Sequence, residues 1–274
     1  MIRIRKITNP YLESNIRKIK AVKDIIRKQF PAIPEKKIEE VELQLTDPLR
    51  YRFQATLFVA ENIHETVKAF AVLLYMPDIR FCFLDYIASS PDNPSSGLGG
   101  ALYERVREEA ISLDAAGLFF ECLPDDPGLC SDPEILTQNR KRLAFYERFG
   151  ARPIDNTLYA TPVKPDDDCP PYLVFDGLGS METISRQHAK KVVRAILERK
   201  YGGYAGADYN RKVIDSIIDD PVIIRAPRYT RRKTMATGPT DLPEKKKIWL
   251  VVNDRHSIHH IRERGYVESP VRVK

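Results

Sequence analysis

The first residues with a spacing that suggests chemistry are the small ones in Ser95-Ser96-Gly97-Leu98-Gly99-Gly100-Ala101, between a β-rich segment and a helical one. Glycines in a strand-to-helix turn let backbone N–H groups approach an anion, and the helix start adds partial positive charge. Pyrophosphate is therefore the natural ligand, although such turns also arise for packing. A Walker loop would need Lys and Ser/Thr where Ala101 and Leu102 stand. A dinucleotide-binding turn would follow the first strand, and this one comes after three or four.

Two acids lie in otherwise apolar strand segments, and a tyrosine follows on a helix. Burying the carboxylate of Asp85 or Glu121 would be costly, so a buried position would suggest a function such as that of a general base. Alternatively, either side chain could face solvent from its strand. Tyr146 by itself fits a packed helix residue. Asn139, seven residues before it, could cap its helix.

The glycine turn and the later helix together resemble the GNAT-type N-acetyltransferases. That family's acetyl-CoA turn reads Gln/Arg-x-x-Gly-x-Gly/Ala, and its later helix reads Asn, six residues, Tyr, three residues, Gly. The matching residues are Gly97, Gly99, Asn139, Tyr146 and Gly150. Pro94 stands at the Gln/Arg position, and Ala151 replaces the usual aromatic residue. The order of elements over residues 1–163 is also similar to that family.

The resemblance implies that acetyl-CoA, the acetyl donor, lies between the fourth and fifth strands, with no metal. The implied cofactor-binding residues are Ala88, Ser89, Ser90, Ser96, Gly97, Leu98, Gly99, Gly100, Ala101 and Asn139. Amides of residues 96–101 would hold the pyrophosphate, and the backbone of 88–90 would bind the pantetheine arm and polarise the thioester carbonyl. The acceptor amine would attack directly. Tyr146 would protonate the thiolate, and Glu121 or Asp85 would be the base.

The acceptor is indicated by an acidic loop of 17 residues between Glu121 and Asn139. The loop has no Lys or Arg, and its acids are Asp125, Asp126, Asp132 and Glu134. An acidic rim would attract a cationic amine, either a lysine side chain or a polyamine. The alternative is a solvated loop whose acids cap helices.

Composition indicates a globular protein without a membrane span. Of the 274 residues, 43% are hydrophobic and 30% charged, which excludes a mostly disordered chain. The longest apolar run, residues 70–76, is far shorter than a span requires. The cysteines are Cys82, Cys122, Cys130 and Cys169. Their spacing fits neither a zinc knuckle nor a CxxC site, so we expect buried free thiols in a reducing cytoplasm.

Hydrophobic periodicity predicts the order β-α-α-β-β-β-α-β-α over about 160 residues. This is an α/β (α+β) fold with a GNAT-like, mostly antiparallel sheet flanked by helices, followed by an α-rich extension. A proline-rich stretch near Pro165 suggests a boundary. We therefore expect an acetyltransferase-like domain over 1–164 and a helical, basic extension or linker over 165–247.

Residues 248–274 resemble the opening of acetylpolyamine amidohydrolases and histone-deacetylase-like proteins, through a strand, a histidine-rich segment and the phrase Val-Glu-Ser-Pro-Val-Arg. The resemblance implies an acetyltransferase–deacetylase fusion cut just inside its second domain. The spacing of His256, His259 and His260 invites a metal interpretation, but no nearby Cys or paired acid completes a site.

The excess charge of +6 lies entirely after residue 164, and much of it lies in residues 225–247. This stretch could bind a polyanion, or it could be a solvated linker. No nucleic-acid-binding motif accompanies it, so we do not expect nucleic acid as a partner. A second alternative is a catalytically weak acetyl-CoA-binding domain that regulates a downstream deacetylase-like domain. A homodimer is compatible with the sequence.

Overall fold

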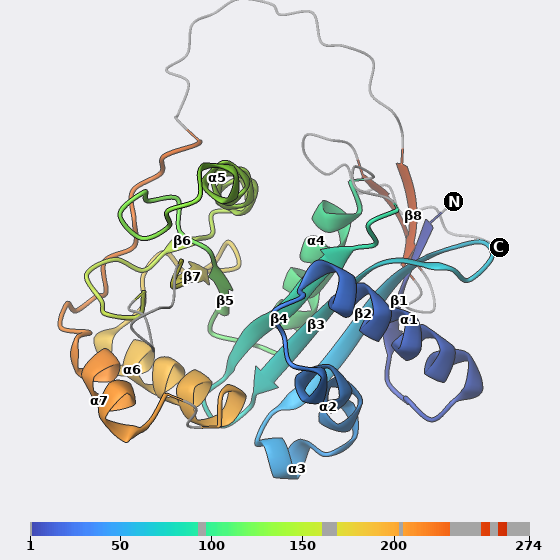
Figure 1. The fold of residues 1–274 in the computed structure, drawn as a ribbon, viewed down its shortest axis with the longest axis horizontal. Coiled ribbons are helices and arrows are strands. Elements are labelled where there is room, and N and C mark those ends of the chain that lie inside the picture. Colours follow the sequence, from blue (N-terminus) through green and yellow to red (C-terminus); the bar gives the residue numbers. More distant parts are fainter. Residues whose placement is uncertain are drawn as a thin grey trace, which may run out of the picture.

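The computed structural model describes residues 2–92, 97–160, 169–202, 205–230, 248–252 and 257–261. Their strands form one mixed, mostly antiparallel sheet with the order β6-β7-β5-β4-β3-β2-β1-β8-β9 (Figure 1). The strands are β1 (Ile2–Ile7), β2 (Gln54–Asn62), β3 (Val67–Met76), β4 (Phe81–Ser89), β5 (Leu118–Cys122), β6 (Arg152–Pro153), β7 (Tyr172–Asp176), β8 (Ile248–Val252) and β9 (Ser257–Ile261). The predicted fold class is confirmed.

Helices cover both faces of this sheet. They are α1 (Glu13–Gln29), α2 (Glu35–Thr46), α3 (Pro48–Tyr51), α4 (Leu98–Ser112), α5 (Pro133–Glu147), α6 (Arg186–Ala195), the π-helical turn η1 (Ile196–Lys200) and α7 (Ala207–Asp215). Figure 1 shows α4 and α5 on one side of the sheet, and α2 and α6 on the other. Strand periodicity explains the two cores: in β3, Phe70 and Val72 pack with α1 and α6, while Ala71 and Leu73 pack with α4.

The sheet opens between β4 and β5. These parallel strands pair only from Cys82↔Leu118 to Leu84↔Phe120, although β4 continues to Ser89. On its other edge, β4 pairs with β3 through Leu84 and Tyr86, which leaves Asp85 as the extra residue of a β-bulge. A bulge bends its strand and increases the local twist. The last paired rung therefore marks the start of a split whose two sides are β4 and β5.

The sheet does not end at residue 164, where the sequence suggested a boundary. Strand β7 lies between β5 and β6 and pairs with both. Helices α6 and α7 contribute Val192, Val193 and Val213 to the core that α1 and α2 also build. Much of the expected extension thus belongs to the same body. The rest of the expected basic stretch, residues 231–247, lies outside the described residues. His256 also lies outside them.

The expectation of buried free thiols does not hold for Cys130 and Cys169. Cys130 and Cys169 form a disulfide, whereas Cys82 and Cys122 are buried free cysteines. The amide of Cys169 donates to the carbonyl of Leu129 at 3.0 Å, and this contact sets side by side two segments that are 39 residues apart. That proximity is invisible in cysteine spacing. Because disulfides persist in oxidising surroundings, the pair removes the cysteine argument for a reducing compartment.

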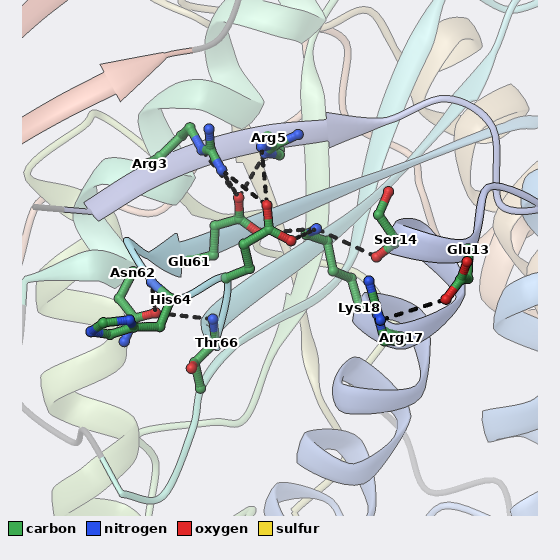
Figure 2. Close-up of polar contacts among 11 residues, drawn as sticks. Arg3, Arg5, Glu13, Ser14, Arg17, Lys18, Glu61, Asn62, His64 and Thr66 are labelled. Carbon is green, nitrogen blue, oxygen red and sulfur yellow. Dashed lines mark hydrogen bonds and ion pairs between the residues drawn. The ribbon is translucent and has the colours of Figure 1, made fainter.

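A buried acid fastens β1, β2 and α1 together. Glu61 in β2 is fully buried, and its Oε1 lies 2.6 Å from both Arg3 Nη2 and Arg5 Nε of β1. Lys18 Nζ of α1 lies 3.4 Å from Oε2. Glu65 joins the same group at 3.2 Å from Lys18. Figure 2 shows the side chains of Arg3, Arg5, Lys18 and Glu61 converging from the two strands and the helix. Three cations thus hold one buried carboxylate.

Among the residues that the structure describes, no helix is both long and apolar enough to cross a membrane.

Candidate active site

The predicted glycine turn leads directly into α4. Gly97 is the residue before the helix and has φ 69°, a left-handed conformation that favours glycine. It has no side chain to cap the helix, and its carbonyl accepts from the amide of Gly100 at 3.1 Å. The amides of Leu98 and Gly99 lie at the helix start, where no earlier turn of the helix can accept from them. These donors and the helix dipole suit an anion.

The space around the turn also suits a ligand. A Cβ atom added to Gly99 would meet no described atom within 4 Å, whereas one added to Gly100 would lie 3.8 Å from the Phe145 ring of α5. Leu98 and Ala101 bury their side chains in the core, so only their backbone is offered. The turn therefore has the open face that a pyrophosphate requires. Ser96, which we expected to share this role, lies outside the described residues.

The end of β4 offers less backbone to the split than the sequence suggested. Ser90 donates its amide to the carbonyl of Lys68 at 2.8 Å, and Ala88 pairs with Phe70 of β3. Because successive residues of a strand direct their backbone groups to opposite edges, Ser89 directs its groups toward the split. Its carbonyl accepts from Gln29 Nε2 of α1 at 2.8 Å. Of residues 88–90, Ser89 is thus the one whose amide faces the expected pantetheine position.

Asp85 stands on the β4 side of the split, one residue beyond the last pair with β5. Its side chain is only 5% exposed. Lys200 of η1 places its Nζ 2.6 Å from one carboxylate oxygen and 2.7 Å from the other. The rings of Tyr86 and Tyr201 flank the same ammonium group, with centroids at 5.3 and 5.9 Å. Asp85 is thus ion-paired within the chain.

Glu121 stands on the β5 side, one residue beyond the same rung. Its Oε1 accepts from the hydroxyl of Tyr159 at 2.7 Å, and its Oε2 accepts from the hydroxyl of Tyr201. Burial raises the pKa of Glu121, and the two tyrosine hydrogen bonds and nearby Lys200 only partly oppose this rise. Asp85 and Glu121 therefore flank one opening, with a charged partner on one and neutral partners on the other.

Tyr146 lies on the α5 side of the sheet. Its ring packs on Phe120, the neighbour of Glu121 in β5, with centroids 4.4 Å apart. It also contacts Tyr103 at 5.0 Å. Burial raises the pKa of Tyr146, and the nearby Cys122 adds to the effect. The phenol therefore stays protonated at neutral pH, as a proton donor must.

Asn139 does not cap its helix, which was one of the two roles expected of it. It lies in the middle of α5, whose N-cap is Asp132. Its side chain is fully buried, and Nδ2 donates to the carbonyl of Pro124 at 2.8 Å. The residue therefore joins the helix to the loop before it, while the cofactor role stays a prediction.

Of the acidic rim that we expected, Asp125 is buried and ion-paired within the chain, whereas Asp126, Asp132 and Glu134 are exposed. Asp125 is buried, lies 2.8 Å from Arg225 Nη1 and accepts from the hydroxyl of Tyr229 at 2.5 Å. Asp132 accepts from two amides of α5, and Asp126 accepts from the amide of Gly128. Asp132 therefore caps its helix, as the alternative proposes, while Asp125 is ion-paired and Asp126 accepts from an amide of its own turn. Arg225, which we assigned to the basic stretch, is paired with Asp125 in the interior of the protein.

Three residues at the split were missed by the sequence analysis, namely Tyr159, Lys200 and Tyr201. No local motif marks them, and two of them lie in the segment interpreted as an extension. For Lys200 and Tyr201 the sequence signal is the apolar helix pattern that precedes them, which must pack against another part of the chain. Across the described part of the chain, no group of three or more His, Cys, Asp or Glu residues is placed to hold a metal ion.

Comparisons with known proteins bear on the fold. No protein-family model and no curated protein matches the chain. A solved structure from Bacteroides thetaiotaomicron, assigned to the GNAT acetyltransferases, is 17% identical and covers 73% of this chain and 98% of its own, with a TM-score of 0.51. A chimaeric spermidine N-acetyltransferase from Vibrio cholerae is 12% identical, with coverages of 65% and 96% and a TM-score of 0.46.

The ribosomal-protein-S18-alanine N-acetyltransferase of Escherichia coli is 20% identical, with coverages of 64% and 92% and a TM-score of 0.42. Only the likeness to the Bacteroides protein is close enough to use, and at that identity it speaks for the fold. The chain therefore has the fold of the GNAT N-acetyltransferases.

Proposed function

We propose that this protein is an acetyl-CoA-dependent N-acetyltransferase that acts on a primary amine, either a lysine side chain or a polyamine. One observation carries the proposal: the split between β4 and β5 has two acids at its start, Asp85 and Glu121, while a glycine turn able to bind an anion follows β4. The GNAT fold supports it. Acetyl-CoA would supply an activated acetyl thioester.

The chain's own groups would position the donor. The amides of Leu98 and Gly99, together with the expected Ser96, would hold the pyrophosphate at the start of α4, because the amides of Gly100 and Ala101 already donate to the Gly97 carbonyl. The Ser89 amide, which faces the split, would bind the pantetheine arm, as an extended chain binds along an open strand edge. This arrangement would bring the thioester toward Asp85 and Glu121.

Glu121 is the better candidate for the base that deprotonates the attacking amine. Asp85 is ion-paired to Lys200, so accepting a proton there would also break a buried ion pair. Glu121 has only neutral hydroxyl donors, and burial raises its pKa toward the pH at which proton transfer is most effective. Tyr146, whose phenol is protonated at neutral pH, would be the proton donor to the departing thiolate.

The proposal is tested by measuring CoA release with butylamine and lysine peptides as acceptors. Removal of a general base costs about 10²–10⁴-fold in rate, so we expect Glu121→Gln to lose that much kcat with acetyl-CoA binding retained. Tyr146→Phe should also slow transfer while leaving binding intact. Equal rates for Glu121→Gln and the unaltered protein would contradict the assignment of the base. Binding without transfer to any amine would favour the regulatory alternative.

Three further parts of the sequence interpretation remain proposals. They are a deacetylase-like domain that starts within residues 248–274, a cytoplasmic location and a homodimer. Within this range the structure describes strands β8 and β9, which pair with each other, and β8 also pairs with β1; neither pairing identifies a second domain. Arg225 and Arg228 both lie near Asp125, so polyanion binding would rely on the remaining cations of that stretch.

A further inference from the structure

The split contains a receptor for an alkylammonium group, and the group in it belongs to the chain. A carboxylate with two flanking aromatic rings is the arrangement that binds organic ammonium ions. Here Asp85 supplies the carboxylate, Tyr86 and Tyr201 supply the rings, and Lys200 supplies the ammonium. The Lys200 side chain is 11% exposed. An amine of the protein thus sits where the proposed reaction would bring an amine from outside.

The chain holds this lysine in place from both sides. Arg199 donates to both oxygens of Asp78, in the turn between β3 and β4, at 2.6 and 2.5 Å, and to the carbonyl of Arg52 at 3.0 Å. On the other side, Tyr201 donates to Glu121. The residues belong to a π-helical turn and its end, and such turns are rare and often mark functional sites. Lys200 is therefore fixed by its neighbours.

Its presence changes the charge that an acceptor would meet. The two acids flanking the split are Asp85, neutralised by Lys200, and Glu121, whose carboxylate is engaged by tyrosine hydroxyls. Asp125, the buried acid of the loop after β5, is paired with Arg225. An amine with one charge needs only Glu121. A polyamine brings further charges that these paired acids do not compensate, and buried charges without partners are costly.

We propose that Lys200 determines acceptor specificity: by filling the ammonium position beside Asp85, it restricts the acceptor to amines with a single positive charge, such as a lysine side chain, and disfavours polyamines. This inference rests on the proposed function and chooses between its two acceptor classes. Lys200→Met would leave Asp85 unpaired and able to bind the second ammonium group of a polyamine.

The test compares spermidine with butylamine, a monoamine that mimics the lysine side chain. Close charge pairs couple strongly, so we expect Lys200→Met to raise the spermidine-to-butylamine ratio of kcat/KM by at least about tenfold. The double variant Asp85→Asn/Lys200→Met removes both charges and should restore the original preference. Lys191→Met, which removes an exposed lysine of α6, should leave the ratio unchanged.

Calorimetric binding of both amines to the free protein gives a second readout that does not depend on turnover. We expect spermidine to bind Lys200→Met at least about tenfold more tightly than it binds the unaltered protein. The double variant should bind spermidine no more tightly than the unaltered protein does. Thermal melting of each variant establishes that it folds. If the unpaired Asp85 of Lys200→Met impairs folding, the double variant, which lacks that charge, should still fold. A spermidine preference in the unaltered protein, or one insensitive to Lys200, would overturn the inference. If no protein acetylated any amine while the binding pattern held, the proposed function would fail instead.

Discussion

Two buried glutamates show how the same side chain is put to different uses. Glu61 is surrounded by the cations of Arg3, Arg5 and Lys18, which bind two strands and a helix together. Glu121 instead accepts hydrogen bonds from two neutral tyrosine hydroxyls, and burial raises its pKa. Cationic partners stabilise the charged form alone. Neutral donors leave the carboxylate able to gain and lose a proton, which a general base must do.

The largest expected effect is on stability at the first of these sites. Glu61→Gln would remove the buried acid that the three cations share and leave the half-exposed Glu65 beside them, and breaking such a buried group costs about 3–5 kcal/mol. We expect this loss in the free energy of unfolding from urea denaturation, with kcat per folded molecule unchanged. Glu13→Gln, which removes an exposed ion pair with Arg17, is the control and should cost less than about 1 kcal/mol. Equal costs for both variants would refute the structural role of Glu61.

Glu121→Gln should behave in the opposite way. A raised pKa in the folded state means that folding favours the protonated acid, so the stability it contributes is full below the unfolded pKa and is lost as pH rises through the folded value. A glutamine is neutral at every pH and escapes that loss. We therefore expect the variant to be at least as stable as the unaltered protein at pH 8, to within about 1 kcal/mol. Destabilisation as large as that of Glu61→Gln would erase the contrast between the two sites.

A smaller effect is expected on the pH dependence of the rate. The base must be ionised, so kcat/KM should fall as pH decreases through the pKa of Glu121. Tyr159 and Tyr201 donate hydrogen bonds that lower this pKa, so Tyr159→Phe and Tyr201→Phe should each move the acidic limb of the profile to higher pH. Tyr11→Phe, at an exposed tyrosine, is the matched control. An acidic limb that stays in place in both variants would show that another group titrates.

The sequence predicted the parts of the site that local patterns encode. The glycine turn, the two strand acids and Tyr146 all lie on the expected elements, because strand and helix periodicity is a property of neighbouring residues. The partners of those residues could not be predicted in this way. Lys200 binds Asp85, which is 115 residues away in the sequence, and Tyr201 binds Glu121, which is 80 residues away. Such contacts depend on how α6 packs against the sheet.

The errors have the same origin. The acidic loop looked available for a ligand because its partner Arg225 lies 100 residues further along the chain. The Cys130–Cys169 disulfide was missed because a hydrogen bond between distant segments brings the two cysteines together. In each case a local pattern identified the chemical group, and only the tertiary structure identified what the group is paired with.

The most direct test of the account is a calorimetric titration with acetyl-CoA of the unaltered chain, Gly99→Glu and Gly99→Gln. Gly99 has open space around its missing side chain, so both variants should fold. The glutamate would place a negative charge at the start of α4, where the glutamine of similar size would not. We predict that the unaltered chain binds, that Gly99→Glu loses binding, and that Gly99→Gln binds more tightly than Gly99→Glu. An unaltered chain that does not bind acetyl-CoA, or a Gly99→Glu variant that binds as well, would contradict the central claim.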